Sequence, residues 1–93
     1  MNFSYKEDIL PDVTVEILEG EIRELVVFND DINTFDHVIN TLIKVCKHTT
    51  EQAEQCTYIV HFKGKCTVKT GAYEFLNPMR ESITLAGISA SIF

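Results

Sequence analysis

The sequence has no long apolar segment. No hydrophobic run approaches the ~20 residues that cross a bilayer, and residues 1–8 do not show the charged-then-apolar pattern of a signal peptide. We therefore expect a soluble, cytoplasmic protein without a membrane partner. The chain also has no internal repeat and no internal linker, and its 93 residues predict one small domain.

Basic residues are scarce. The chain has 8 Lys and Arg against 14 Asp and Glu, which gives a formal net charge of −6. Nucleic acid is therefore excluded as the main partner, because neutralising its phosphates needs clustered Lys and Arg. An acidic protein of this kind favours cationic ligands or basic protein surfaces.

Cysteines are few, and no metal-binding motif accompanies them. Cys46, Cys56 and Cys66 are evenly spaced, but no CxxC or Cys/His pattern occurs. The odd number and the missing secretory signal predict free thiols in a reducing compartment. We expect these cysteines to act as small hydrophobic residues, and we expect no metal and no cofactor.

The periodicity of the sequence predicts an α+β domain with a β-α-α-β-α-β order. Residues 1–20 are rich in acidic residues and are interpreted as a mobile acidic arm, with residues 21–93 as the folded domain. Strands are predicted over 22–28, 66–70 and 88–93. These three strands should form an antiparallel sheet with three helices packed on one face.

Three segments carry helix signals. Apolar residues recur at helical spacing from Phe35 to Cys46, behind a possible Asn33 or Thr34 cap. A second helix opens at Thr49, which can form a capping box with Gln52, and stops at Gly64. A third is expected to begin after a short turn at 73–76, with Asn77 as its cap and Pro78 at its first position.

Two polar motifs end apolar elements. Asn29, Asp30 and Asp31 follow the first strand, and His61 lies at the end of the second helix, before a basic turn that contains Gly64. If the fold joins these ends, hydrogen-bond acceptors lie beside an apolar surface. That combination suits a protonated amine attached to an apolar side chain. Two simpler interpretations stay open: Asn and Asp commonly form turns, and a histidine is favoured at a helix C-terminus.

These motifs, in this order and at this separation, resemble ClpS, the small adaptor of the Clp AAA+ protease. The resemblance covers roughly residues 22–93. It implies that the protein binds the N-terminal segments of substrate proteins that begin with a bulky hydrophobic residue, known as N-degrons. It also implies delivery of these substrates to the N-terminal domain of a ClpA or ClpC type unfoldase.

The resemblance also implies roles for particular residues. By position, Asn29, Asp30 and His61 correspond to the ligands of the α-amino group. The residues implied to form the pocket are Asp31, Asn33, Phe35, Val38, Thr57, Val60 and Ile88. Glu74 matches an acidic unfoldase-contact residue, and Arg80 stands near a position where the family has a lysine.

The chain differs from the family pattern at the pocket. Phe35 and Thr57 stand where many members carry methionine, so one adds bulk to the pocket and the other removes it. The resemblance therefore leaves open which bulky N-terminal residue is preferred.

Two rival interpretations remain. Asp30, Asp31 and His61 are also residue types that can bind a divalent metal or act in acid-base catalysis. No nucleophile motif or phosphate loop supports an enzyme, and we expect that the protein is not one. The second rival is a protein-interaction domain of the same fold that has no pocket for an N-terminal residue, resembling the C-terminal domain of the ribosomal stalk protein.

Overall fold

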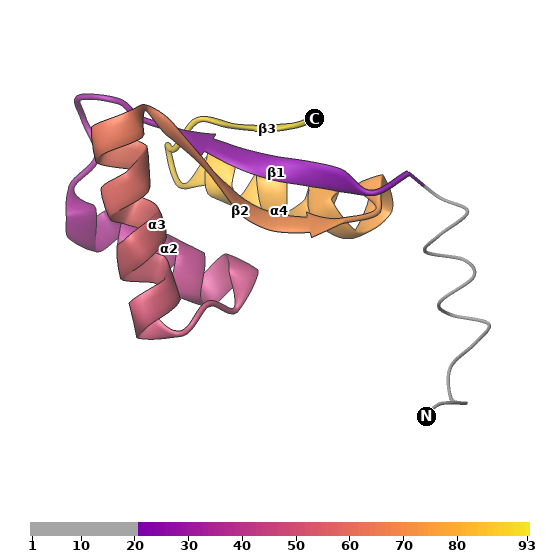
Figure 1. Cartoon of the computed structure of the whole chain (residues 1–93), viewed down its shortest axis with the longest axis horizontal. Coiled ribbons are helices and arrows are strands. Elements are labelled where there is room, and N and C mark those ends of the chain that lie inside the picture. Colours follow the sequence, from indigo (N-terminus) through magenta and orange to yellow (C-terminus); the bar gives the residue numbers. More distant parts are fainter. Residues whose placement is uncertain (1–20) are drawn as a thin grey trace.

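The computed structural model describes residues 21–93, and the predicted acidic arm of residues 1–20 lies outside this range. The elements follow the predicted β-α-α-β-α-β order, which confirms the α+β fold class (Figure 1). They are β1 (Arg23–Phe28), α2 (Phe35–Cys46), α3 (Thr50–Lys63), β2 (Lys65–Gly71), α4 (Tyr73–Leu85) and β3 (Ala90–Ile92).

The three strands form one antiparallel sheet in the order β2-β1-β3, so the first strand is the central one. The register of β1 against β2 shifts between Leu25 and Val26, whose partners are Lys69 and Thr67. Val68 is thereby left unpaired, as in a β-bulge. Its side chain is buried and packs in the core.

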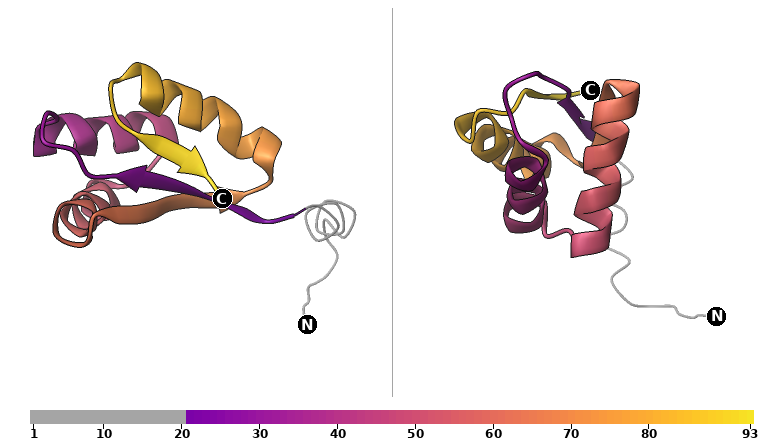
Figure 2. Two further views of the ribbon diagram at one scale, coloured as in Figure 1. Left: turned by 90° about the horizontal axis from the view of Figure 1, so that it is seen from above. Right: turned by 90° about the vertical axis from the view of Figure 1, so that its left-hand side faces the viewer.

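The helices cover one face of the sheet (Figures 1 and 2). β1 sends its fully buried residues Leu25 and Val27 into the core beneath them. The other largest fully buried side chains come from the helices. They are Leu42, Cys46, Leu76 and Ile83.

Caps fix the ends of α2 and α3, and through them the position of the site. Thr34, one of the two predicted caps, accepts a hydrogen bond from the backbone N–H of His37 at 3.1 Å. The predicted capping box between Thr49 and Gln52 is confirmed, with distances of 2.9 and 3.1 Å. Gly64 ends α3 at φ 94°, a left-handed conformation that glycine adopts without strain.

The predicted start of the third helix is wrong. α4 begins at Tyr73 rather than at Pro78, which lies inside the helix. The carbonyl of Ala72 accepts hydrogen bonds from the N–H groups of Phe75 and Leu76, both at 3.1 Å, and Leu76 is fully buried. Burying a leucine contributes about 1.5–3 kcal/mol, which offsets much of the ~3 kcal/mol cost of an interior proline. Tertiary packing therefore extends the helix through a residue that usually marks its beginning.

Candidate binding pocket

The fold brings the two polar motifs together. β1 ends beside the turn that follows α3, and the backbone N–H of Asn29 donates to the carbonyl of Gly64 at 2.9 Å. Phe28 is paired with Lys65 in the same sheet. The acceptors after β1 and the histidine near the end of α3 therefore lie at one end of the molecule.

A pocket of about 300 Å³ lies at this junction. Its lining contains every residue that was predicted for the amine site and for the pocket. These are Asn29, Asp30, Asp31, Asn33, Phe35, Val38, Thr57, Val60, His61 and Ile88.

Three further lining residues were missed by the sequence reasoning: Val27, Phe28 and Thr34. Val27 and Phe28 end the strand that leads into the first motif, and Thr34 caps the helix that follows it. Their position next to predicted site residues could have identified them, because residues that flank a binding loop lie close to the same pocket.

The inner wall of the pocket is apolar. Val38, Val60 and Ile88 come from α2, α3 and the segment before β3, and all three are buried. Thr57 is also buried, and its hydroxyl donates to the carbonyl of Ala53 at 2.7 Å. Because that hydroxyl already has a hydrogen-bond partner within α3, a ligand does not need to supply one at this part of the wall.

Asp30 is one of two acidic residues that line the pocket, and hydrogen bonds within the loop hold its carboxylate. Its Oδ1 accepts from the backbone N–H groups of Ile32 and Asn33, both at 2.8 Å, and its Oδ2 accepts from Asn33 Nδ2 at 2.7 Å. The backbone bond from Asn33 is the main cause that lowers the pKa of this carboxyl from its ordinary value of 3.8, and the backbone bond from Ile32 adds to it. A carboxylate has about four acceptor sites, so Oδ2 keeps one for a ligand.

Asn33 connects this carboxylate to the opposite wall. Its Nδ2 group donates to Asp30 Oδ2 and also to the backbone carbonyl of Gly87, at 2.9 Å. Gly87 directly precedes the wall residue Ile88. Asn33 thereby ties the charged side of the pocket to the segment between α4 and β3.

Aromatic rings border the pocket on its α2 and α3 side. Phe35 and His61 both line it, and their rings meet edge to face with centroids 5.0 Å apart. Phe35 is half-buried and His61 is exposed. The histidine is therefore accessible to a ligand from solvent while the phenylalanine restricts how its ring can turn.

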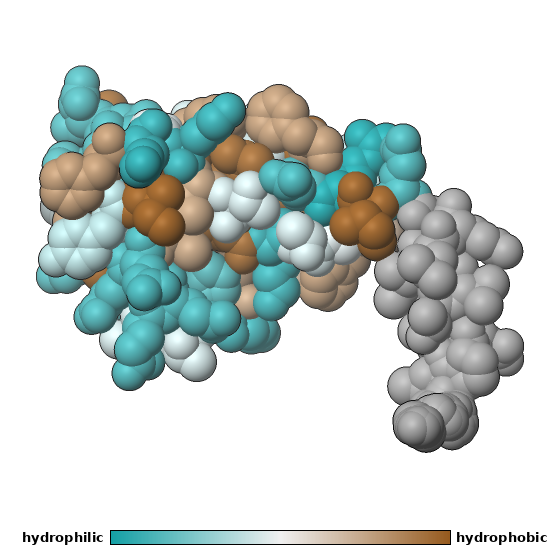
Figure 3. All heavy atoms as spheres, in the orientation of Figure 1, coloured by the Kyte–Doolittle hydropathy of each residue, from teal (hydrophilic) through white to brown (hydrophobic). Residues whose placement is uncertain are grey.

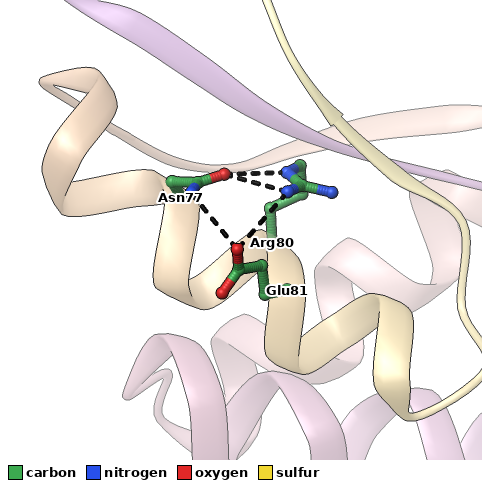
Figure 4. Close-up of polar contacts among 3 residues, drawn as sticks. All are labelled: Asn77, Arg80 and Glu81. Carbon is green, nitrogen blue, oxygen red and sulfur yellow. Dashed lines mark hydrogen bonds and ion pairs between the residues drawn. The ribbon is translucent and has the colours of Figure 1, made fainter.

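The two residues predicted to contact an unfoldase both lie on α4. Glu74 is exposed in the first turn, and Arg80 donates to Asn77 Oδ1 at 3.1 and 2.9 Å while Glu81 lies 3.9 Å away (Figure 4). At 3.6 residues per turn, six positions separate Glu74 and Arg80 by about 120° around the helix. The structure therefore places them on different sides of α4.

The cysteines are free, as predicted. Burial raises the pKa of the Cys46 thiol to about 11 and, together with the nearby Cys56, that of Cys66 to about 12. These two thiols therefore stay protonated at neutral pH and behave as apolar groups. Within residues 21–93, no set of three or more His, Cys, Asp or Glu side chains is arranged to hold a metal ion.

The fold and the pocket together define a class of protein: a small α+β binding domain whose pocket sets hydrogen-bond acceptors against an aliphatic wall. A family model described as ATP-dependent Clp protease adaptor protein ClpS matches residues 21–88, which is more than half of the chain. The chain belongs to the ClpS family, as the resemblance implied. Membership of this adaptor family supports the prediction that the protein is not an enzyme.

Two curated relatives that are ClpS adapters agree with this assignment. The ClpS adapter of Thermosynechococcus vestitus is 34% identical over 71% of this chain and 71% of its own, and that of Nostoc sp. is 31% identical over 85% and 89%. The E3 ubiquitin-protein ligase UBR1 of Drosophila melanogaster is 30% identical over 86% of this chain, which spans 5% of that ligase.

A solved structure shares the fold. Agrobacterium tumefaciens ClpS2, bound to L-phenylalaninamide, superimposes with a TM-score of 0.74 over 80% of this chain and 96% of its own, at 16% identity. This likeness confirms the predicted three-stranded antiparallel sheet with its three helices. In the part of the chain that the structure describes, no helix combines the length and apolarity needed to cross a membrane.

Proposed function

We propose that this chain is an N-degron adaptor. It binds proteins whose first residue is bulky and hydrophobic, and it delivers them to the N-terminal domain of a ClpA or ClpC type AAA+ unfoldase for degradation. One observation carries the proposal: Asn29, Asp30 and His61 line the same pocket as the apolar residues Val60 and Ile88. An amine and an apolar side chain on the same carbon fit that arrangement.

The polar side of the pocket suits an α-amino group. Such a group has a pKa of about 7.7–8.0 and, when protonated, offers three N–H donors. Asn29 offers an amide oxygen, Asp30 its remaining carboxylate site, and a neutral His61 a ring nitrogen. Charge-assisted hydrogen bonds contribute roughly 1.5–3 kcal/mol each. An internal residue has only an uncharged amide with one N–H, so the site selects chain ends.

The apolar side sets the size of the first residue. A volume of about 300 Å³ is at the lower end of ligand pockets, which suits one side chain. Burying a Leu or Phe side chain adds about 1.5–3 kcal/mol, and after the cost of association we expect low-micromolar affinity, about −8 kcal/mol. The bound L-phenylalaninamide of the Agrobacterium ClpS2 supports this ligand class, because it joins a free α-amine to an aromatic side chain.

The test uses fluorescence anisotropy with one labelled peptide in three forms: Leu or Phe first, Met first, and Phe first but N-acetylated. We expect micromolar binding of the first form alone. Equal binding of all three forms would refute the proposal and favour a domain of the same fold without an N-terminal-residue pocket. Delivery is tested separately, by degradation of a Leu-initiated reporter protein with the unfoldase and its protease present.

A further inference from the structure

An exposed aromatic surface adjoins the pocket on α3. Tyr58 and Phe62, four positions apart, are 52% and 73% exposed, and their rings stack nearly parallel, at 7° and 6.1 Å between centroids. Figure 3 shows apolar side chains at the α3 end of the molecule. We call these two residues the aromatic ridge.

The ridge is continuous with the pocket. Phe35 contacts Tyr58 edge to face at 5.4 Å, and His61 contacts Phe62 at 4.9 Å. Phe35 and His61 both line the pocket, whereas Tyr58 and Phe62 do not. A ligand held in the pocket therefore meets the ridge where it leaves across the α3 rim.

The ridge has the chemistry of a site for an apolar side chain. Two stacked rings present a large surface that gains from burial, and aromatic pairs add affinity beyond the area they bury. The nearby charges do not favour an ionic partner. Glu54 lies one turn before Tyr58, and Lys63 directly follows Phe62. Because the two charges are opposite in sign, a charged ligand side chain of either sign would be repelled by one of them.

From this geometry we propose that the aromatic ridge is a second subsite, which binds a large apolar or aromatic side chain at the second residue of the bound substrate. The proposal rests on the proposed function, since the first residue must occupy the pocket. The chain of such a substrate has to leave the pocket over its rim, and the ridge contacts two residues that line the pocket, Phe35 and His61. Position 2 is the first side chain outside the pocket.

The experiment compares three peptides that begin Leu-Ala, Leu-Phe and Leu-Asp, by anisotropy against the full chain. We expect Leu-Phe to bind about 2- to 12-fold more tightly than Leu-Ala, with no such gain for Leu-Asp. Phe62→Ala should remove the advantage of Leu-Phe and leave the affinity for Leu-Ala unchanged, while Phe62→Leu should restore part of it. Tyr73→Ala, which removes another exposed aromatic residue, on α4, is the control and should change neither.

The outcomes separate the two proposals. If wild-type protein binds none of the peptides, the proposed function fails and the subsite with it. If Leu-Ala binds and Leu-Phe binds no better, only the subsite is refuted. An equal loss of both peptides in Phe62→Ala would also refute it, because the ring would then support the pocket. Sedimentation completes the test: a dimer that Phe62→Ala dissociates would assign the ridge to a second copy of the chain.

Discussion

Replacing Asp30 with asparagine isolates the charge of the proposed amine site from the structure of its loop. Asp30→Ala would remove all the hydrogen bonds that the carboxylate accepts from Ile32 and Asn33. Asparagine keeps the size of the side chain and one oxygen, so it preserves the two backbone bonds at Oδ1. It loses the negative charge and replaces Oδ2 with an NH2 group.

The expected loss of affinity follows from the role of Asp30 Oδ2. Its remaining acceptor site is the one available to a ligand amine, and a hydrogen bond to a charged group contributes about 1.5–3 kcal/mol. We therefore expect Asp30→Asn to weaken binding of a Leu-initiated peptide by about 10- to 150-fold. The side chain of Asn33 loses its bond to the same charged oxygen, which costs at most about 1.5–3 kcal/mol and lowers Tm by several degrees.

The assay is anisotropy at neutral pH, with Tm measured on the same samples. Asp36→Asn is the matched control, because Asp36 is an exposed acid in the first turn of α2 that does not line the pocket. It removes the same charge from the protein without touching the site. The reasoning is refuted if Asp30→Asn binds as wild type does, or if Asp36→Asn weakens binding equally.

Three further predictions concern the histidine of the site, stability and delivery. His61→Ala should weaken binding of a Leu-initiated peptide by about 10- to 150-fold, because it removes a ring nitrogen that the proposed amine site offers as an acceptor; wild-type affinity of this variant, measured by anisotropy at neutral pH, would remove His61 from the site. His48→Ala should lower the unfolding free energy by about 1–3 kcal/mol, measured by urea denaturation, because buried His48 Nε2 donates to the carbonyl of Val68 at 2.7 Å; peptide affinity should be unchanged. Deleting residues 1–20, which we propose engage the unfoldase, should spare peptide binding, because the residues that line the pocket all lie within residues 21–93, and should impair degradation of a bound substrate. Normal degradation would contradict that role.

Most of the fold could be predicted because helix caps and stops depend on residues within one or two turns of each other, which the sequence shows directly. The capping box at Thr49 and the glycine stop at Gly64 depend only on neighbouring residues, and both are confirmed. The start of α4 is different. Asn77 and Pro78 favour a helix start locally, but Leu76 is buried against residues distant in the sequence, and no local pattern reports that contact.

Ten of the thirteen residues that line the pocket were named from the two motifs and from the resemblance to ClpS, but their connections were not predicted. That Asn33 joins Asp30 to the carbonyl of Gly87 depends on how α2 and the segment after α4 approach each other. The bulge that leaves Val68 unpaired likewise follows from the register of two strands. Such contacts join residues 20 or more positions apart, and the sequence alone does not fix their geometry.

The two interpretations of Asp30, as a turn-forming residue and as a ligand of an amine, are compatible in this geometry. The turn that Asn and Asp residues commonly form is present, because Oδ1 binds two backbone N–H groups. Those bonds lower the pKa of the carboxyl and fix its orientation, so the loop prepares the charge that an amine would meet. A carboxylate that is free to rotate in water loses bound water and rotational entropy when it binds a ligand. In the folded protein, three of the roughly four acceptor sites of Asp30 already bind N–H groups, so less entropy is lost on binding. The turn therefore suits Asp30 to the role that we propose for it, and its presence does not argue against the amine site.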